Sequence, residues 1–112
     1  WSMNDKLVHD LIVGTMRQRY AKEYKEIIVD PDTCPELILK NHGMVLAVVS
    51  VETEGSITPE KADQWKRIAD EGAKLVLMVP KQSRVNVTDM LWQKMLTDRV
   101  SVGTYEIAIS MP

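Results

Sequence analysis

The chain has 112 residues, of which 45% are hydrophobic and 27% charged, and its formal net charge is −2. This length predicts a single domain over residues 1–112. The negative net charge excludes a global electrostatic attraction to nucleic acid, so such binding would need a local basic patch. The lone Cys34 excludes an intrachain disulfide, and no apolar run reaches membrane-spanning length. We therefore expect a cytoplasmic protein without a membrane partner.

The first half of the chain predicts one helix and three strands. Residues 5–22 are expected to be helical, because apolar side chains recur there at helical spacing. These side chains are Leu7, Val8, Leu11, Ile12 and Met16. Strands are expected at 24–29, 37–39 and 44–52, with a hairpin turn at 40–43. The continuous apolar run at 44–52 indicates a strand buried on both faces, and hence a central place in the sheet.

A second helix is predicted to begin at Thr58. Thr58 is a suitable N-cap, and Pro59 suits the first helical position. The helix is expected to end near Asp70, and an apolar strand follows at 74–79. A strand, a capped helix and a second strand form a βαβ unit, which predicts that 44–52 and 74–79 are parallel.

The last elements are a short helix and a strand. Thr88 and Asp89 are expected to cap a helix that ends near Leu96. Its predicted packing residues are Leu91, Trp92, Met95 and Leu96. The final strand is expected over 100–110, and a change in its apolar alternation at Gly103 predicts a β-bulge. The predicted order is αβββαβαβ, which is an α/β fold with a mixed central sheet and helices on both faces.

Carboxylates gather where the predicted central strand ends. Ser50, Glu52 and Glu54 alternate along an extended backbone, so they share one face with about 6.6 Å between neighbours. Such an arrangement can present acids to a metal ion at the end of a buried strand.

This pattern resembles the restriction-endonuclease-like, or PD-(D/E)xK, nuclease superfamily over nearly the whole chain. The segment PELIL at 35–39 is similar to the strand that opens with Pro-Asp in that family. Position 50 lies 14 residues after Glu36, so Ser50 and Glu52 fall where the family has its (D/E)-x-K pair. Gln64 falls near the family's helical Gln. The residues that continue from this pair are similar to a small prokaryotic branch of the superfamily: VET with Gly and Ser at 51–56, a capped helix with Gln-Trp at 64–65, and an apolar strand that ends in Val-Pro at 79–80.

The resemblance implies a set of site residues and a metal. Glu36, Glu52, Lys61 and Gln64 are the implied catalytic residues. Glu36 and Glu52 are the implied ligands of Mg²⁺ or Mn²⁺. Three positions depart from the family pattern: Glu36 replaces Asp, Ser50 replaces the metal-binding acid, and Glu52 replaces the lysine. Lys61 would then supply a positive charge from the next helix.

A second register stays open, in which Asp32, Glu52 and Glu54 are the metal ligands. In this register Asp32 would be the acid of the family's Pro-Asp. The pair Glu52 and Glu54 would then be the acids on the strand, and the lysine would still be missing.

Two functions are consistent with this degenerate motif. The first is a metal-dependent DNA endonuclease with weak or no activity. The second is a non-catalytic module on the nuclease fold that binds nucleic acid or a partner protein. Formation of a homodimer is a further possibility.

The remaining candidates are interpreted as structural or solvated residues. They are Cys34, His9, His42 and a basic set that could instead contact phosphates: Arg17, Arg19, Lys22, Lys25, Lys81 and Arg84.

Overall fold

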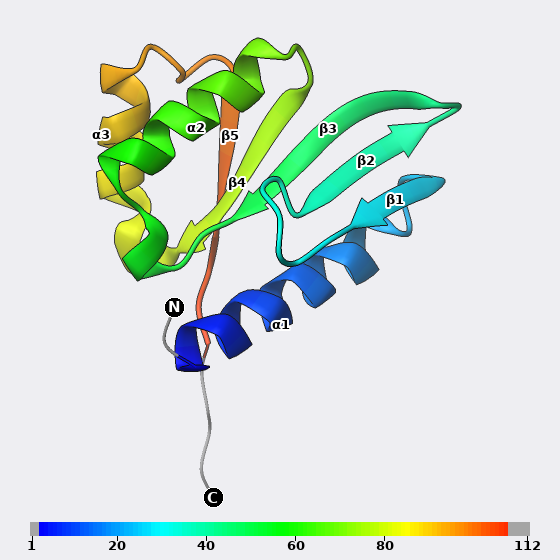
Figure 1. Cartoon of the computed structure of the whole chain (residues 1–112), viewed down its shortest axis with the longest axis horizontal. Coiled ribbons are helices and arrows are strands. Elements are labelled where there is room, and N and C mark those ends of the chain that lie inside the picture. The colour runs from blue at the N-terminus through cyan, green and yellow to red at the C-terminus, as the bar shows by residue number, and fades with distance from the viewer. Residues whose placement is uncertain (1–2, 108–112) are drawn as a thin grey trace, which may run out of the picture.

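The computed structural model describes residues 3–107, in which three helices accompany five strands (Figure 1). The helices are α1 (Met3–Tyr20), α2 (Pro59–Asp70) and α3 (Arg84–Gln93). The strands are β1 (Glu26–Val29), β2 (Leu37–Asn41), β3 (Met44–Val51), β4 (Lys74–Pro80) and β5 (Val100–Tyr105). Short 3-10 helices, η1 (Glu54–Ser56) and η2 (Lys81–Ser83), follow β3 and β4. The predicted α/β class is confirmed.

The five strands form one mixed sheet in the order β1-β2-β3-β4-β5. β2 is antiparallel to both β1 and β3, whereas β4 is parallel to both β3 and β5. β3 is therefore the middle strand, and the predicted parallel pairing of β3 with β4 is confirmed. The antiparallel half and the parallel half of the sheet meet at β3.

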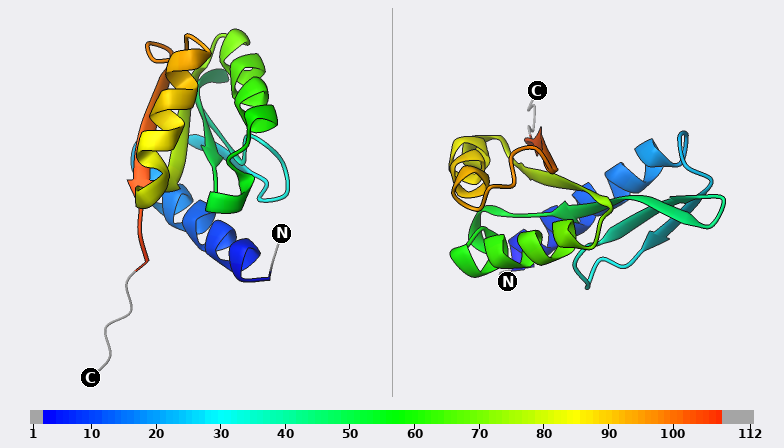
Figure 2. Two further views of the ribbon diagram at one scale, coloured as in Figure 1. Left: turned by 90° about the vertical axis from the view of Figure 1, so that its left-hand side faces the viewer. Right: turned by 90° about the horizontal axis from the view of Figure 1, so that it is seen from above.

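Helices cover both faces of this sheet (Figures 1 and 2). α1 packs against β2 and β3, and the buried residues of this core are Ile12, Val13, Met16, Leu37, Leu39, Ala47, Val49 and Val51. α2 and α3 pack on the other face, where the buried residues include Val48, Ala62, Trp65, Ile68, Leu75, Leu77, Leu91 and Leu96. Since side chains alternate along a strand, β3 contributes to both cores.

The turn between β2 and β3 is tighter than predicted. β2 extends to Asn41, which pairs with Met44. Only His42 and Gly43 remain between the strands, with φ values of 53° and 77°. Two consecutive positive φ angles are typical of a two-residue hairpin turn that matches the twist of the strands.

The inward face of α1 differs from the expected stripe. Leu7 and Leu11 are exposed, whereas His9 is buried together with Ile12 and Val13. The prediction is confirmed for Ile12 and Met16 and is wrong for Leu7 and Leu11, because hydrophobicity gave no weight to a histidine that has a buried partner on the sheet.

α3 begins four residues earlier than predicted and ends at Gln93. It follows directly from η2, so Thr88 lies inside the helix and does not cap it. Leu91 is buried as expected, but Trp92 and Met95 are 70% and 80% exposed. The predicted packing roles of Trp92 and Met95 are therefore wrong, because the helix presents its Val87 and Leu91 side to the sheet.

β5 has no bulge at Gly103. Its pairing with β4 runs without a register shift, and Gly103 lies opposite Met78. A Cβ at Gly103 would come within 2.6 Å of Met78 Sδ, so close contact with the neighbouring strand accounts for this glycine. The strand ends at Tyr105, and residues 108–110 of the predicted strand lie outside the described residues.

The caps of α2 and α3 can be tested with a matched pair of threonines. The Thr58 side chain accepts a hydrogen bond from Lys61 N at 3.2 Å, as expected of an N-cap. Thr58→Ala should lower the free energy of unfolding by about 1 kcal/mol in urea denaturation. Thr88→Ala should leave stability unchanged or raise it slightly, because Thr88 is an exposed residue inside α3. Equal losses in both variants would contradict the α3 boundary.

Candidate functional site

A buried carboxylate lies at the end of the central strand. Glu52 follows β3, and its side chain is only 1% exposed. Its Oε1 accepts hydrogen bonds from Ser50 Oγ at 2.8 Å and from Trp65 Nε1 at 3.3 Å. Its Oε2 accepts a hydrogen bond from Ser56 Oγ at 2.6 Å. Both oxygens are thus bound by donors from β3, η1 and α2.

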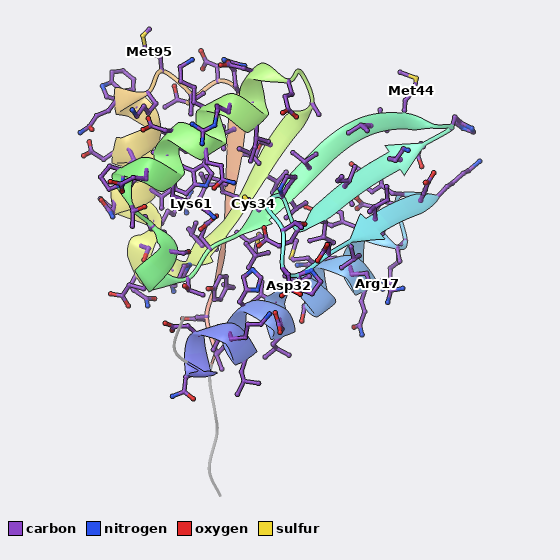
Figure 3. The ribbon with its side chains drawn as sticks, viewed as in Figure 1. Arg17, Asp32, Cys34, Met44, Lys61 and Met95 are labelled. Carbon is purple, nitrogen blue, oxygen red and sulfur yellow. The ribbon has the colours of Figure 1, made fainter. Side chains whose placement is uncertain are left out.

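Lys61 and Cys34 complete this cluster. Lys61 Nζ lies 3.7 Å from Glu52 Oε1 and reaches it from the first turn of α2. Cys34 Sγ lies 3.2 Å from Ser50 Oγ, so the thiol is linked to Glu52 through that hydroxyl. Figure 3 labels Lys61 and Cys34, which lie beside the end of β3. We call these residues, Cys34, Ser50, Glu52, Ser56, Lys61 and Trp65, the Glu52 cluster.

Burial dominates the electrostatics of the Glu52 cluster. Desolvation raises the pKa of Glu52, and the opposing effects of Ser56, Lys61, Ser50 and Trp65 do not cancel it. Desolvation also raises the pKa of Cys34 above its ordinary value of 9.0. The thiol is therefore protonated at neutral pH, so Cys34 is a packing and hydrogen-bonding residue and not an activated nucleophile.

The second buried acid, Glu36, lies on the α1 side. Its Oε2 accepts a hydrogen bond from Val51 N at 2.9 Å and is joined to His9 Nε2 at 2.6 Å. Glu36 and His9 are each 3% exposed. His9 Nδ1 lies 3.1 Å from Asp10 Oδ1. This histidine therefore joins the middle of α1 to the sheet through a short polar contact.

The two acids are held by helices on opposite faces of the sheet. Glu36 bonds to His9 of α1, whereas Glu52 bonds to Trp65 and Lys61 of α2. The structure thus brings together Ser50, Glu52 and Lys61 of the predicted set. Gln64 is half-buried on α2, and within residues 3–107 no hydrogen bond joins it to either acid. The catalytic and metal-binding roles of these residues stay predictions.

The acids of the alternative register are dispersed. Asp32 is exposed and forms an ion pair with Lys6 at 2.9 Å. Glu54 lies on η1, beside a cavity of about 420 Å³ that Asp5 and Tyr105 also line. In the described part of the chain, no group of three or more His, Cys, Asp or Glu side chains is placed to hold a metal ion.

The sequence analysis missed four residues that hold the two acids. Trp65 is absent from the predicted site, and the sequence analysis interprets His9 as structural or solvated. Ser56 was overlooked, although a serine three residues after Thr53 can bond back to the Thr53 backbone, which it does at 2.9 Å. Tyr105 donates to the Glu52 carbonyl oxygen at 2.6 Å, and burial raises its pKa to about 12. No local pattern signals this last contact, because it joins residues 53 positions apart.

Comparisons with protein-family models, curated proteins and solved structures found no match to this chain. Among the helices in residues 3–107, none is long and apolar enough to cross a membrane.

The contact between His9 and Glu36 predicts a pH-dependent stability. Burial on its own lowers the pKa of His9, but the hydrogen bonds to Glu36 and Asp10 outweigh it, so the pKa lies above the ordinary 6.5. Protonated His9 therefore adds to the free energy of unfolding. This added stability is fully present below the unfolded-state pKa of His9 and is lost as the pH rises through its folded-state pKa. The excess stability of wild type over His9→Gln should therefore be larger at pH 6 than at pH 9 in urea denaturation.

His42→Asn is the matched control for this comparison, because His42 is exposed in the hairpin turn and Asn tolerates its positive φ. This variant should show a much smaller difference between the two pH values. If the excess stability of wild type over His9→Gln instead increased with pH, the pKa of His9 would not be raised as assigned.

Proposed function

We propose that this protein is a non-catalytic binding module related to the PD-(D/E)xK nucleases, with nucleic acid or a partner protein as its ligand. The proposal is supported by the αβββαβαβ element order and by a mixed sheet with an acid at the end of its middle strand. It is also supported by the degenerate motif, in which Ser50 and Glu52 stand where the family has an acid and a lysine.

The observation that carries the proposal is that both carboxylate oxygens of Glu52 already have partners within the protein. Three donors and one cation surround its two oxygens, and the side chain is 1% exposed. A metal-binding carboxylate must direct a lone pair at the ion, which in turn holds the reacting water. Glu52 directs its lone pairs at the protein, so its role is to hold η1 and α2 against the end of β3.

The expected Mg²⁺ or Mn²⁺ fits this arrangement poorly. Hard divalent cations take several oxygen ligands from carboxylates, carbonyls and water. Glu36 is occupied by His9 and Val51 N, and the next candidate ligand, Ser50, donates its hydroxyl to Glu52. An ion bound by Glu52 would therefore have to displace existing hydrogen bonds of that carboxylate.

A weak endonuclease is the second candidate, and one observation favours it. Lys61 Nζ is 3.7 Å from Glu52 Oε1, so α2 supplies an ammonium group beside the acid although the strand itself has no lysine. In the nuclease superfamily such a cation would stabilise the charge that develops on the phosphate. This function would require Glu52 to exchange its internal donors for a metal ion.

A plasmid-nicking assay with Mn²⁺ separates the two candidates. We expect no metal-dependent nicking by wild type, and no change in its melting temperature when Mn²⁺ is added. Ser50→Asp places a second carboxylate beside Glu52, so saturating Mn²⁺ should raise the melting temperature of this variant by about 4 °C or more. Glu52→Gln is the control, because it removes the charge and keeps a side chain of similar size. Wild-type nicking that Glu52→Gln abolishes would establish the endonuclease and overturn our proposal.

A further inference from the structure

α3 exposes large apolar side chains on the side that does not pack on the core. Val85 and Trp92 are seven positions apart, so they lie on the same side of the helix, and they are 82% and 70% exposed. Met95 follows three residues after Trp92 and is 80% exposed. α3 lies at one end of the molecule (Figure 1), and Figure 3 labels Met95 there, with its side chain directed away from the ribbon.

A hollow of about 420 Å³ adjoins these side chains, and it combines apolar groups with both signs of charge. The residues that line it are Arg84, Val85, Thr88, Asp89, Trp92 and Thr97. We call these six residues and Met95 the α3 surface. Asp89 accepts a hydrogen bond from Gln93 at 3.4 Å. Within residues 3–107, neither Arg84 nor Asp89 forms an ion pair, so both charges remain available to a partner.

Met95 occupies a backbone position that favours glycine. Its φ is 58°, and it follows the C-cap residue Lys94. Met95 N donates to Trp92 O at 3.1 Å and Leu96 N donates to Leu91 O at 2.8 Å, which is the Schellman arrangement of a helix end. A side chain with a Cβ is disfavoured in this conformation relative to glycine. The chain therefore places a large, exposed apolar side chain where folding alone favours none, and such outliers point to a role outside the fold.

We propose that the α3 surface is the interface of a symmetric homodimer. In a twofold dimer both copies use the same patch, so that patch must be complementary to itself. The α3 surface meets this condition, because it carries projecting apolar side chains beside a hollow, and a cation beside an anion. This inference goes beyond the proposed function and does not depend on it, since the α3 surface contains no residue of the Glu52 cluster.

An antiparallel pairing of the two α3 helices brings the complementary groups together. We place Val85 of one copy opposite Trp92 of the second copy, so that the two apolar side chains meet on each side of the twofold axis. Each residue advances a helix by about 1.5 Å, so Arg84 then lies about 6 Å along the axis from Asp89 of the second copy. An arginine side chain spans this distance. Two symmetry-related ion pairs therefore form beside the apolar contacts.

The size of the apolar contact predicts a weak dimer. Burial of Val85, Trp92 and Met95 would remove on the order of 400 Å² of surface from each copy. This is about half of the roughly 800 Å² that each partner buries in a standard interface. The polar residues of the α3 surface supply further contact area. We therefore expect a reversible dimer that forms at micromolar concentrations.

A second copy fits the α3 surface better than a highly charged ligand does. Nucleic acid and anionic membranes favour surfaces that carry cations alone. The hollow instead places Asp89 beside Arg84, so one of its charges would repel a ligand of either sign. A partner that itself carries both charges satisfies both residues, and a second copy of this chain is such a partner.

Sedimentation velocity from micromolar to millimolar protein concentrations tests the proposal. Wild type should change from monomer to dimer over this range. Trp92→Ala removes the largest exposed side chain of the interface, so its dissociation constant should be about tenfold higher or more. Leu11→Ala is the matched control and should associate as wild type does, because Leu11 is 57% exposed on α1, on the other face of the sheet. A wild type that stays monomeric, or equal weakening in the two variants, would overturn the proposal.

Met95→Gly separates association from folding. Glycine relieves the positive φ at this position, so the melting temperature of the monomer in dilute solution should rise by about 4 °C. The same variant loses an apolar contact of the interface, so its dissociation constant should rise about fivefold or more. A role in folding alone would leave association unchanged, and that result would overturn the assigned surface.

A charge exchange tests the pairing between copies. Asp89→Arg should weaken the dimer about tenfold, because it brings like charges together on both sides of the twofold axis. Arg84→Asp/Asp89→Arg exchanges the two charges and should restore the association of wild type. Equal weakening in the single and the double variant would overturn the antiparallel pairing. Binding of wild type to phosphatidylcholine vesicles without self-association would show that the α3 surface meets a membrane, and would overturn the proposal as well.

Discussion

The arrangement around the middle strand depends on one buried carboxylate. Glu52 is the point at which β3, η1 and α2 meet, and its four partners come from all three elements. Tyr105 adds β5 by bonding to the Glu52 carbonyl. An isolated buried charge is costly, and it is tolerated only where hydrogen bonds and a counter-charge surround it. The cluster therefore specifies where the chain leaves the sheet and how α2 begins.

The sheet uses its two acids to attach its two helical layers. Glu36 contacts α1 through His9, and Glu52 contacts α2 through Trp65 and Lys61. Each contact is a polar anchor beside an apolar core, and polar partners specify position more narrowly than apolar packing does. Both acids thus attach a helix to the sheet.

The sequence predicted the elements that rely on local signals. Thr58 and Pro59 marked α2 correctly, and the apolar runs at 44–52 and 74–79 identified a central parallel pair. It failed where tertiary contacts override local preference. Thr88 has the chemistry of a cap, yet α3 already continues from η2. His9 is polar, yet it is buried because Glu36 is opposite it. For the candidate site, spacing along β3 placed Ser50 beside Glu52, but it could not show which face the Glu36 side chain reaches.

The Glu52 cluster is divided among several elements, and this limits which side chains position 52 could accept. An ammonium group at position 52 would meet Lys61, and the donors Ser50, Ser56 and Trp65 would lose their acceptor. Breaking a buried charged pair by changing one partner costs about 3–5 kcal/mol, a large share of the stability of a small domain. A lysine at position 52 would therefore require compensating changes at the residues that now bind Glu52. The identity of residue 52 thus depends on residues from three separate parts of the chain, in β3, η1 and α2.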